Sequence, residues 1–158
     1  MTTLYQIAKM LHIIGFVAAI GVTLATFIAY KRFWILYGEN RDQGIAAFKA
    51  FAYLQIAGMI GFATVLVGGL TMVFLVNWSF ASLLWFQIKL SLIVLLFVNG
   101  LTLGRTSAMK FQKFLSDSRG SSLSDVEIQS LRRRLNRFQL LQLFLFTAII
   151  VLSVFRFV

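Results

Sequence analysis

Long apolar runs alternate with short polar stretches along this chain. Four of the runs are each long enough for the roughly 20 helical residues that cross a hydrocarbon layer: Met10–Tyr30, Phe51–Val76, Phe80–Gly104 and Phe138–Val158. The pattern predicts an all-α fold, a polytopic membrane protein with a four-transmembrane-helix bundle that forms one domain over residues 1–158. We expect its helices at about 4–34, 46–77, 80–115 and 124–158.

The third and fourth helices are predicted to continue beyond the membrane. Residues 105–115 contain no helix breaker, and Ser124 and Glu127 have the spacing of a capping box, with Leu123 and Ile128 placed as a hydrophobic staple. Apolar positions then recur at helical spacing opposite a basic face; the apolar ones are Ile128, Leu131, Leu135 and Phe138, and the basic ones Arg132, Arg133 and Arg137. The sequence thus predicts a helical hairpin in the cytosol.

The charge distribution predicts the orientation of the helices. The chain has 15 Lys and Arg against 5 Asp and Glu, and the basic residues concentrate between Arg105 and Arg137 and between Lys31 and Lys49. By the positive-inside rule these two loops are cytoplasmic, so both termini are extracytoplasmic. Basic residues beside a membrane attract anionic lipid headgroups. We therefore expect membrane lipids, with anionic headgroups at the cytosolic loops, as partners and no nucleic acid.

Small and polar residues mark the expected interior faces of the helices. Small residues let transmembrane backbones approach closely, and amides and hydroxyls bond across helices. The positions on these faces are His12, Gly15, Ala19, Thr23 and Thr26 in the first helix; Gln55, Gly58, Gly61, Gly68 and Gly69 in the second; Lys89 and Asn99 in the third; and Gln139 and Gln142 in the fourth. Helix packing is the simplest interpretation of each glycine, threonine and amide, and the glycine-rich second helix leaves a homodimer open.

His12 and Lys89 form the candidate site. They are the only two ionisable side chains inside apolar runs and away from their ends, and intramembrane ionisable groups are usually functional. Counting residues from the outer interface places both roughly 10 Å deep, at the level of Gly68 and Gly69. A neutral imidazole is a good axial ligand for haem iron, a glycine pair leaves room for a flat macrocycle, and a lysine pairs with a propionate or a lipid phosphate.

Other interpretations of these residues stay open at this stage. Lys89 can extend its long stem to the outer interface, or become a neutral hydrogen-bond donor, and His12 can be a buried hydrogen-bonding residue without a ligand. The chain has no Cys and a single His, so a thiolate metal site is excluded and a copper or zinc site is poorly supported.

The order of motifs resembles the HemJ-type protoporphyrinogen oxidase and CopD-like group of four-helix integral membrane proteins. The segment Lys9–His12 is similar to that family's first-helix Lys-x-x-His, Val67–Leu70 to its second-helix glycine, Trp85–Leu90 to its Trp-x-x-x-Lys-Leu, and Arg134–Arg137 lies where the family has Arg-x-x-Asn. The resemblance implies haem b bound through His12, with Lys89 as the second functional residue. It also implies a protein of the bacterial inner membrane that oxidises the porphyrin precursor protoporphyrinogen.

Two departures from the family leave alternatives open. After the histidine the chain lacks the family's proline–arginine pair, and Asn136–Gln139 lacks the acid and the proline of Asn-Glu-x-Pro. A divergent relative that keeps the pocket without the reaction is one alternative. The others are a small CopD-like copper or ion transporter and a non-catalytic lipid-binding protein in which Lys89 holds a lipid phosphate.

Overall fold

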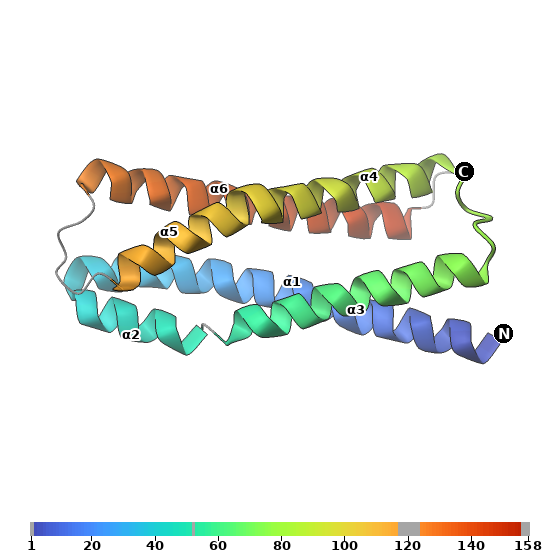
Figure 1. Cartoon of the computed structure of the whole chain (residues 1–158), viewed down its shortest axis with the longest axis horizontal. Coiled ribbons are helices and arrows are strands. Elements are labelled where there is room, and N and C mark those ends of the chain that lie inside the picture. Colours follow the sequence, from blue (N-terminus) through green and yellow to red (C-terminus); the bar gives the residue numbers. More distant parts are fainter. Residues whose placement is uncertain (1, 52, 117–123, 156–158) are drawn as a thin grey trace. The chain divides into compact units, whose positions relative to one another are not determined.

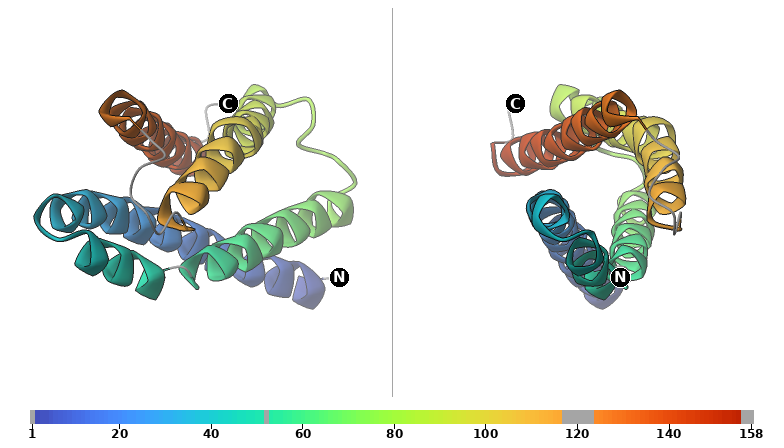
Figure 2. Two further views of the ribbon diagram at one scale, coloured as in Figure 1. Left: turned by 60° about the vertical axis from the view of Figure 1, so that its left-hand side comes forward. Right: turned by 90° about the vertical axis from the view of Figure 1, so that its left-hand side faces the viewer.

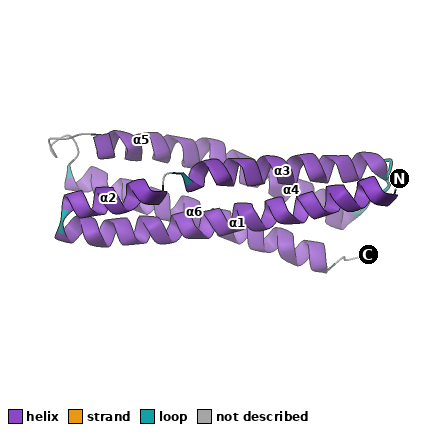
Figure 3. Ribbon diagram, turned by 90° about the horizontal axis from the view of Figure 1, so that it is seen from below, coloured by secondary structure: helices purple, strands orange, loops and turns teal. Residues whose placement is uncertain are grey.

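The described part of the chain is helical apart from short loops (Figure 3). The structure is a computed structural model, and it describes residues 2–51, 53–116 and 124–155. Its elements, in chain order, are α1 (Thr2–Glu39), α2 (Arg41–Phe51), α3 (Leu54–Leu75), α4 (Leu84–Asn99), the π-helical segment η1 (Gly100–Gly104), α5 (Arg105–Ser116) and α6 (Asp125–Val154), as shown in Figure 1. The predicted all-α class is confirmed.

Four helical stretches are long and apolar enough to cross a membrane: Thr3–Glu39, Ile56–Leu75, Leu84–Leu115 and Val126–Val154. Each contains one of the predicted apolar runs or most of it. The fold is therefore that of a multi-pass membrane protein, as the hydrophobic pattern predicts.

Backbone contacts divide the chain into two compact units, Met1–Gln87 and Ile88–Val158. The single domain expected over residues 1–158 stays a prediction. In the first unit α1 packs against both α2 and α3 (Figures 1 and 2). Since α1 has 38 residues, it is about 57 Å long, which exceeds the hydrocarbon thickness. It is therefore long enough for α2 and α3 to pack against different parts of it.

The first unit differs from the predicted helix boundaries in two places. α1 continues to Glu39 rather than ending near residue 34, and the expected helix over 46–77 is two helices, because α2 ends at Phe51 and α3 begins at Leu54. α1 and α2 are separated by Asn40, whose Oδ1 accepts hydrogen bonds from the backbone N–H groups of Asp42 and Gln43. Asn40 thereby caps α2 at its N-terminus.

An aromatic cluster joins α2 to the end of α1. Phe33 is fully buried, and its ring lies 4.9 Å from that of Trp34, 5.4 Å from that of Tyr37 and 5.9 Å from that of Phe48 on α2. Close ring contacts of this kind stabilise beyond the area they bury. The cluster explains why α2 folds back along α1.

The second unit contains one long helix interrupted by a π-helical turn. α4, η1 and α5 follow one another without a loop, so the predicted continuation over 105–115 is confirmed. α6 starts at the predicted capping box: Ser124 Oγ accepts from the Glu127 N–H at 3.3 Å, and Ser124 N donates to Glu127 Oε2 at 2.9 Å. The expected staple involves Leu123, which lies outside the described residues.

The predicted two-faced pattern of α6 is also observed. Leu131 and Leu135 are buried, whereas the three arginines of the basic face are exposed: Arg132, Arg133 and Arg137. Backbone contacts join α6 to η1 and to α5. The two arms of the predicted hairpin therefore pack against each other, and the basic residues remain on the outside.

Candidate functional site

His12 is fixed to the neighbouring helix by a hydrogen bond. Its Nδ1 lies 2.7 Å from the main-chain oxygen of Val65 on α3. A carbonyl oxygen can only accept, so Nδ1 carries the hydrogen and donates it. In the neutral form of this tautomer the lone pair of the ring is at Nε2, and a backbone carbonyl bonded to Nδ1–H is a common way of orienting a metal-binding histidine.

The imidazole also packs directly on Gly69. A Cβ placed on Gly69 would lie 3.1 Å from both Cε1 and Nδ1 of His12. The ring edge formed by these two atoms therefore faces α3, while Nε2 and Cδ2 complete the other side of the ring. Half-buried, His12 has its orientation set by two points of contact with α3, the Val65 oxygen and the bare backbone at Gly69.

Gly68 brings the backbones of α1 and α3 together beside this histidine. A Cβ on Gly68 would lie 2.8 Å from the main-chain oxygen of Ala8 and 2.9 Å from the main-chain nitrogen of His12. Such distances are too short for a real Cβ, so only glycine allows this approach. One turn further along α1, a Cβ on Gly15 would lie 2.7 Å from the oxygen of Gly61.

These contacts show what the glycine pair does in the fold. The space beside Gly68 is taken by the backbone of α1, and the space beside Gly69 is taken by the His12 ring. Both glycines thus serve helix packing, the simplest of the interpretations that the sequence allows. Their predicted role in leaving room for a flat macrocycle stays a prediction.

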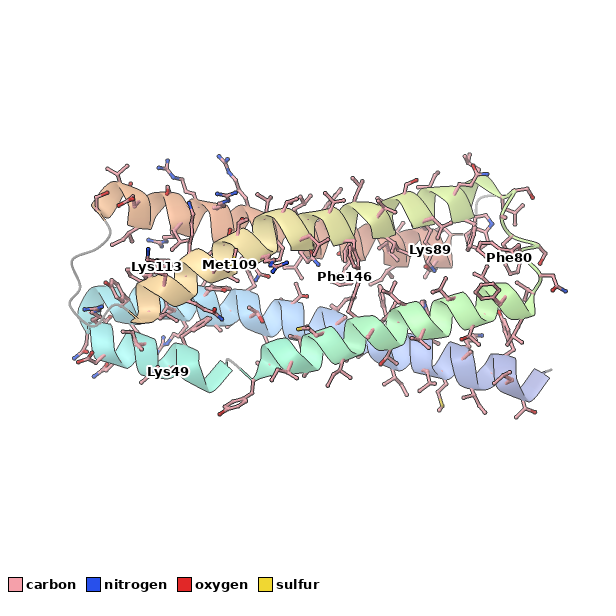
Figure 4. All side chains as sticks on the ribbon, in the orientation of Figure 1. Lys49, Phe80, Lys89, Met109, Lys113 and Phe146 are labelled. Atoms are coloured by element: carbon pink, nitrogen blue, oxygen red, sulfur yellow. The ribbon has the colours of Figure 1, made fainter. Side chains whose placement is uncertain are left out.

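Lys89 lies near the start of α4 and is half-buried (Figure 4). It belongs to the second unit, whereas His12, Gly68 and Gly69 belong to the first. The structure therefore brings the histidine and the two glycines together, and the expected convergence of Lys89 on them stays a prediction.

A polar contact in the second unit confirms that amides bond between helices. Asn99 Nδ2 donates to Gln142 Oε1 at 2.7 Å and lies 3.4 Å from the main-chain oxygen of Phe138. The Thr23 hydroxyl behaves differently, because it donates to the oxygen of Ala19 one turn earlier in its own helix at 2.8 Å. The predicted cross-helix role thus holds for the amide of Asn99 and not for this threonine.

Sequence reasoning missed the π-helical turn and the buried Ser107 that follows it. η1 spans Gly100–Gly104, and Ser107 is fully buried. The signal in the sequence is the glycine at each end of the five-residue segment, since glycine has a low helix propensity. A Cβ on Gly104 would lie 2.9 Å from the Phe138 ring, so this glycine admits an aromatic side chain of α6.

Among the described residues, no three His, Cys, Asp or Glu side chains lie close enough together to hold a metal ion. With one His in the sequence, the chain offers His12 as a single imidazole ligand. A haem iron needs only one such protein ligand because the porphyrin supplies four nitrogens, so the residues present fit a haem better than a bare copper or zinc ion.

Comparison with protein families, with curated proteins and with solved structures finds no match to this chain. The resemblance to the HemJ-type and CopD-like group accordingly stands on the motifs themselves.

Proposed function

We propose that this protein is a haem-associated protein of the bacterial inner membrane, related to the HemJ-type protoporphyrinogen oxidases, with His12 as the ligand of a haem b iron. The observation that carries the proposal is the hydrogen bond from His12 Nδ1 to the Val65 oxygen. It selects the tautomer whose lone pair is at Nε2, the nitrogen that would bind iron.

The residues around His12 have distinct roles in this proposal. Val65 orients the imidazole through its main-chain oxygen, and Gly69 leaves room for the Nδ1–Cε1 edge of the ring against α3. Gly68 holds α1 at the distance at which both contacts are made. Lys89 would pair with a haem propionate or deliver a proton to a porphyrin substrate.

A bound haem b would supply one-electron redox chemistry. What the chain itself provides is a single oriented ligand and one cationic side chain at membrane depth. With both termini outside and the basic ends of α5 and α6 in the cytosol, anionic headgroups would lie against the exposed arginines of α6. A homodimer remains compatible with the single His12, because a second protomer would supply a second imidazole.

The test is an absorption spectrum of the purified chain, oxidised and then reduced with dithionite, from cells grown with sufficient haem. We expect a Soret band and reduced b-type bands, and their loss in His12→Ala while helix content and elution volume stay unchanged. Thr23→Ala is the matched control, since it removes a hydroxyl of α1 that donates to the Ala19 oxygen of its own helix. A featureless spectrum after haem supplementation would contradict the proposal.

Gly69→Ala tests the positioning role of the bare backbone. The added methyl would lie 3.1 Å from two ring atoms, so the imidazole must shift and the Val65 hydrogen bond weakens. We expect weaker haem retention with the bundle still folded. Because the chain has one His, a nitrogen NMR spectrum with labelled histidine reports this ring alone; a hydrogen on Nε2 rather than Nδ1 in the unaltered protein would remove the basis of the proposal.

A further inference from the structure

Three buried polar atoms of the second unit have no hydrogen-bond partner among the residues that the structure describes: Asn99 Oδ1, Ser107 Oγ and Gln139 Oε1. Their side chains are at most 5% exposed. A buried polar group without a partner is expensive, and most of all inside a bilayer, where no solvent replaces the lost hydrogen bond. All three atoms can accept a hydrogen bond, and the Ser107 hydroxyl can also donate one.

The orientation of the Asn99 amide is fixed by its neighbours. Its Nδ2 faces the main-chain oxygen of Phe138 and Oε1 of Gln142. The Phe138 oxygen can only accept, so the nitrogen of Asn99 must point toward it. The unpaired Oδ1 therefore does not result from an amide drawn the wrong way round.

The π-helical turn aligns Ser107 with Asn99. The two residues are eight positions apart in sequence, which in an uninterrupted α-helix turns them about 80° from each other around the axis. A π-helical turn takes in roughly one residue more than an α-helical turn. With η1 between them, the separation corresponds to about seven α-helical positions, or two turns, so both residues lie on one face about 10 Å apart along the axis.

That face is the one turned toward α6. Asn99 bonds to Gln142, and Gly104 between the two polar residues contacts the Phe138 ring. Gln139 lies on α6 one turn before Gln142. The unpaired acceptors thus lie along the junction of η1 and α5 with α6. The junction starts at the end of the third apolar run, where Arg105 is exposed to solvent.

We propose that this junction binds internal water molecules, which donate to Asn99 Oδ1, Gln139 Oε1 and Ser107 Oγ and carry solvent from the end of the apolar run to Asn99, five residues inside it. Water is the ligand that fits the charge as well as the acceptors. The chain has a formal net charge of +10 and no acidic residue inside its apolar runs, so a bound cation would meet repulsion without a counter-ion. The filled junction gives protons a hydrated route to the level of Asn99.

The chain contains no cysteine, so single cysteines can report on this water without background. Silver ion replaces the proton of a thiol, forms an S–Ag bond and releases H⁺, and it reacts through the thiolate, which requires hydration. The experiment uses the full chain in lipid nanodiscs carrying Gln139→Cys. After silver treatment the protein is unfolded, and the thiols that remain are labelled with a fluorescent maleimide.

The matched control is Leu140→Cys, the adjacent residue on α6, which is 50% exposed on the outer surface at the same depth. A second pair is Asn99→Cys against Val98→Cys, since Val98 is 49% exposed. We expect the junction cysteines to react at least about tenfold faster than their controls because only they contact water. Equal protection of Gln139→Cys and Leu140→Cys would overturn the proposal.

A second variant keeps the proposal testable if cysteine disturbs the junction. Gln139→Leu removes the acceptor and leaves an apolar side chain of similar size. If the Oε1 atom is dry, its removal relieves a buried unpaired group and raises the melting temperature. If it is bonded to water, as we propose, the melting temperature stays the same or falls, so a clear rise would refute the inference.

Discussion

The helix–helix contacts of the two units are made by different kinds of residue. In a bilayer no hydrophobic force drives one helix against another, so contact depends on close packing and on hydrogen bonds. The first unit packs backbone on backbone, with Gly15 and Gly61 on one level and Gly68 against Ala8 on another. The second unit packs large side chains and amides, with Phe138 over Gly104 and Asn99 bonded to Gln142.

The difference has a consequence for chemistry. Where backbones touch, space is used completely, and a side chain placed there, such as His12, has one orientation. Where amides meet, some of their hydrogen-bonding capacity is left over, as it is at Asn99 and Gln139. The first unit is therefore suited to holding a ligand atom rigidly, and the second to admitting small polar molecules.

The largest effect is expected from Gly15→Ala in the first unit. The new Cβ would lie 2.7 Å from the Gly61 oxygen and 2.9 Å from the Val65 nitrogen, both of which are backbone atoms that can move only with their helix. Overpacking of this kind costs about 2–3 kcal/mol of unfolding free energy. Denaturant titration in mixed micelles measures it.

Gly21→Ala is the control for that measurement, because a Cβ at Gly21 meets nothing within 4 Å. It should be neutral or slightly stabilising, since alanine has the higher helix propensity. If the two alanine variants were equally stable, the close approach of α1 and α3 would not be what holds the first unit together.

A smaller effect is expected from Asn99→Leu in the second unit. The change removes the 2.7 Å bond to Gln142, and interhelical bonds of this kind in membranes contribute about 1 kcal/mol. The double variant with Gln142→Leu should recover part of the loss, because neither amide is then left unpaired. Additive losses in the two single variants would show that the amides do not interact.

The smallest effect is expected from Ser124→Ala at the start of α6. Loss of an N-cap costs as little as about 0.5 kcal/mol, and here the loss is confined to an exposed end of the helix. The N–H of Glu127 donates a hydrogen bond to Ser124 Oγ. Hydrogen exchange should therefore accelerate at this N–H and remain slow near Leu135. Faster exchange throughout α6 would mean that the cap holds more of the second unit than its own turn.

Periodicity and charge predict much of this fold. The apolar runs predict the four spanning helices, and the Ser124–Glu127 spacing predicts the start of α6, because both depend on neighbours along the chain. The break at Asn40 and the π-helical turn are harder to predict. The first depends on a cap at a position where the apolar pattern already fades, and the second inserts a residue without altering the overall helical character of the segment.

The candidate site was predictable in its residues and not in its contacts. A histidine in an apolar run stands out by its cost, whereas its bond to the Val65 oxygen depends on how α1 and α3 are staggered, which composition does not determine. The glycines illustrate the same limit. Their small size predicts a close approach, but only the structure shows that the approaching atoms at Gly68 and Gly69 belong to Ala8 and His12.

The contacts between α1 and α3 follow alternating steps of four and three residues. The contacting positions with this spacing are Ala8, His12, Gly15, Ala19 and Val22 on α1 and Gly58, Gly61, Val65 and Gly68 on α3, and Ala18, Thr64 and Gly69 make contacts beside them. A repeat of seven falls short of two full turns of a straight helix, so two helices that keep it must wind around each other with a left-handed supercoil. The first unit thus has the heptad spacing of an antiparallel coiled coil, with small residues in place of leucine. His12 occupies one of its core positions.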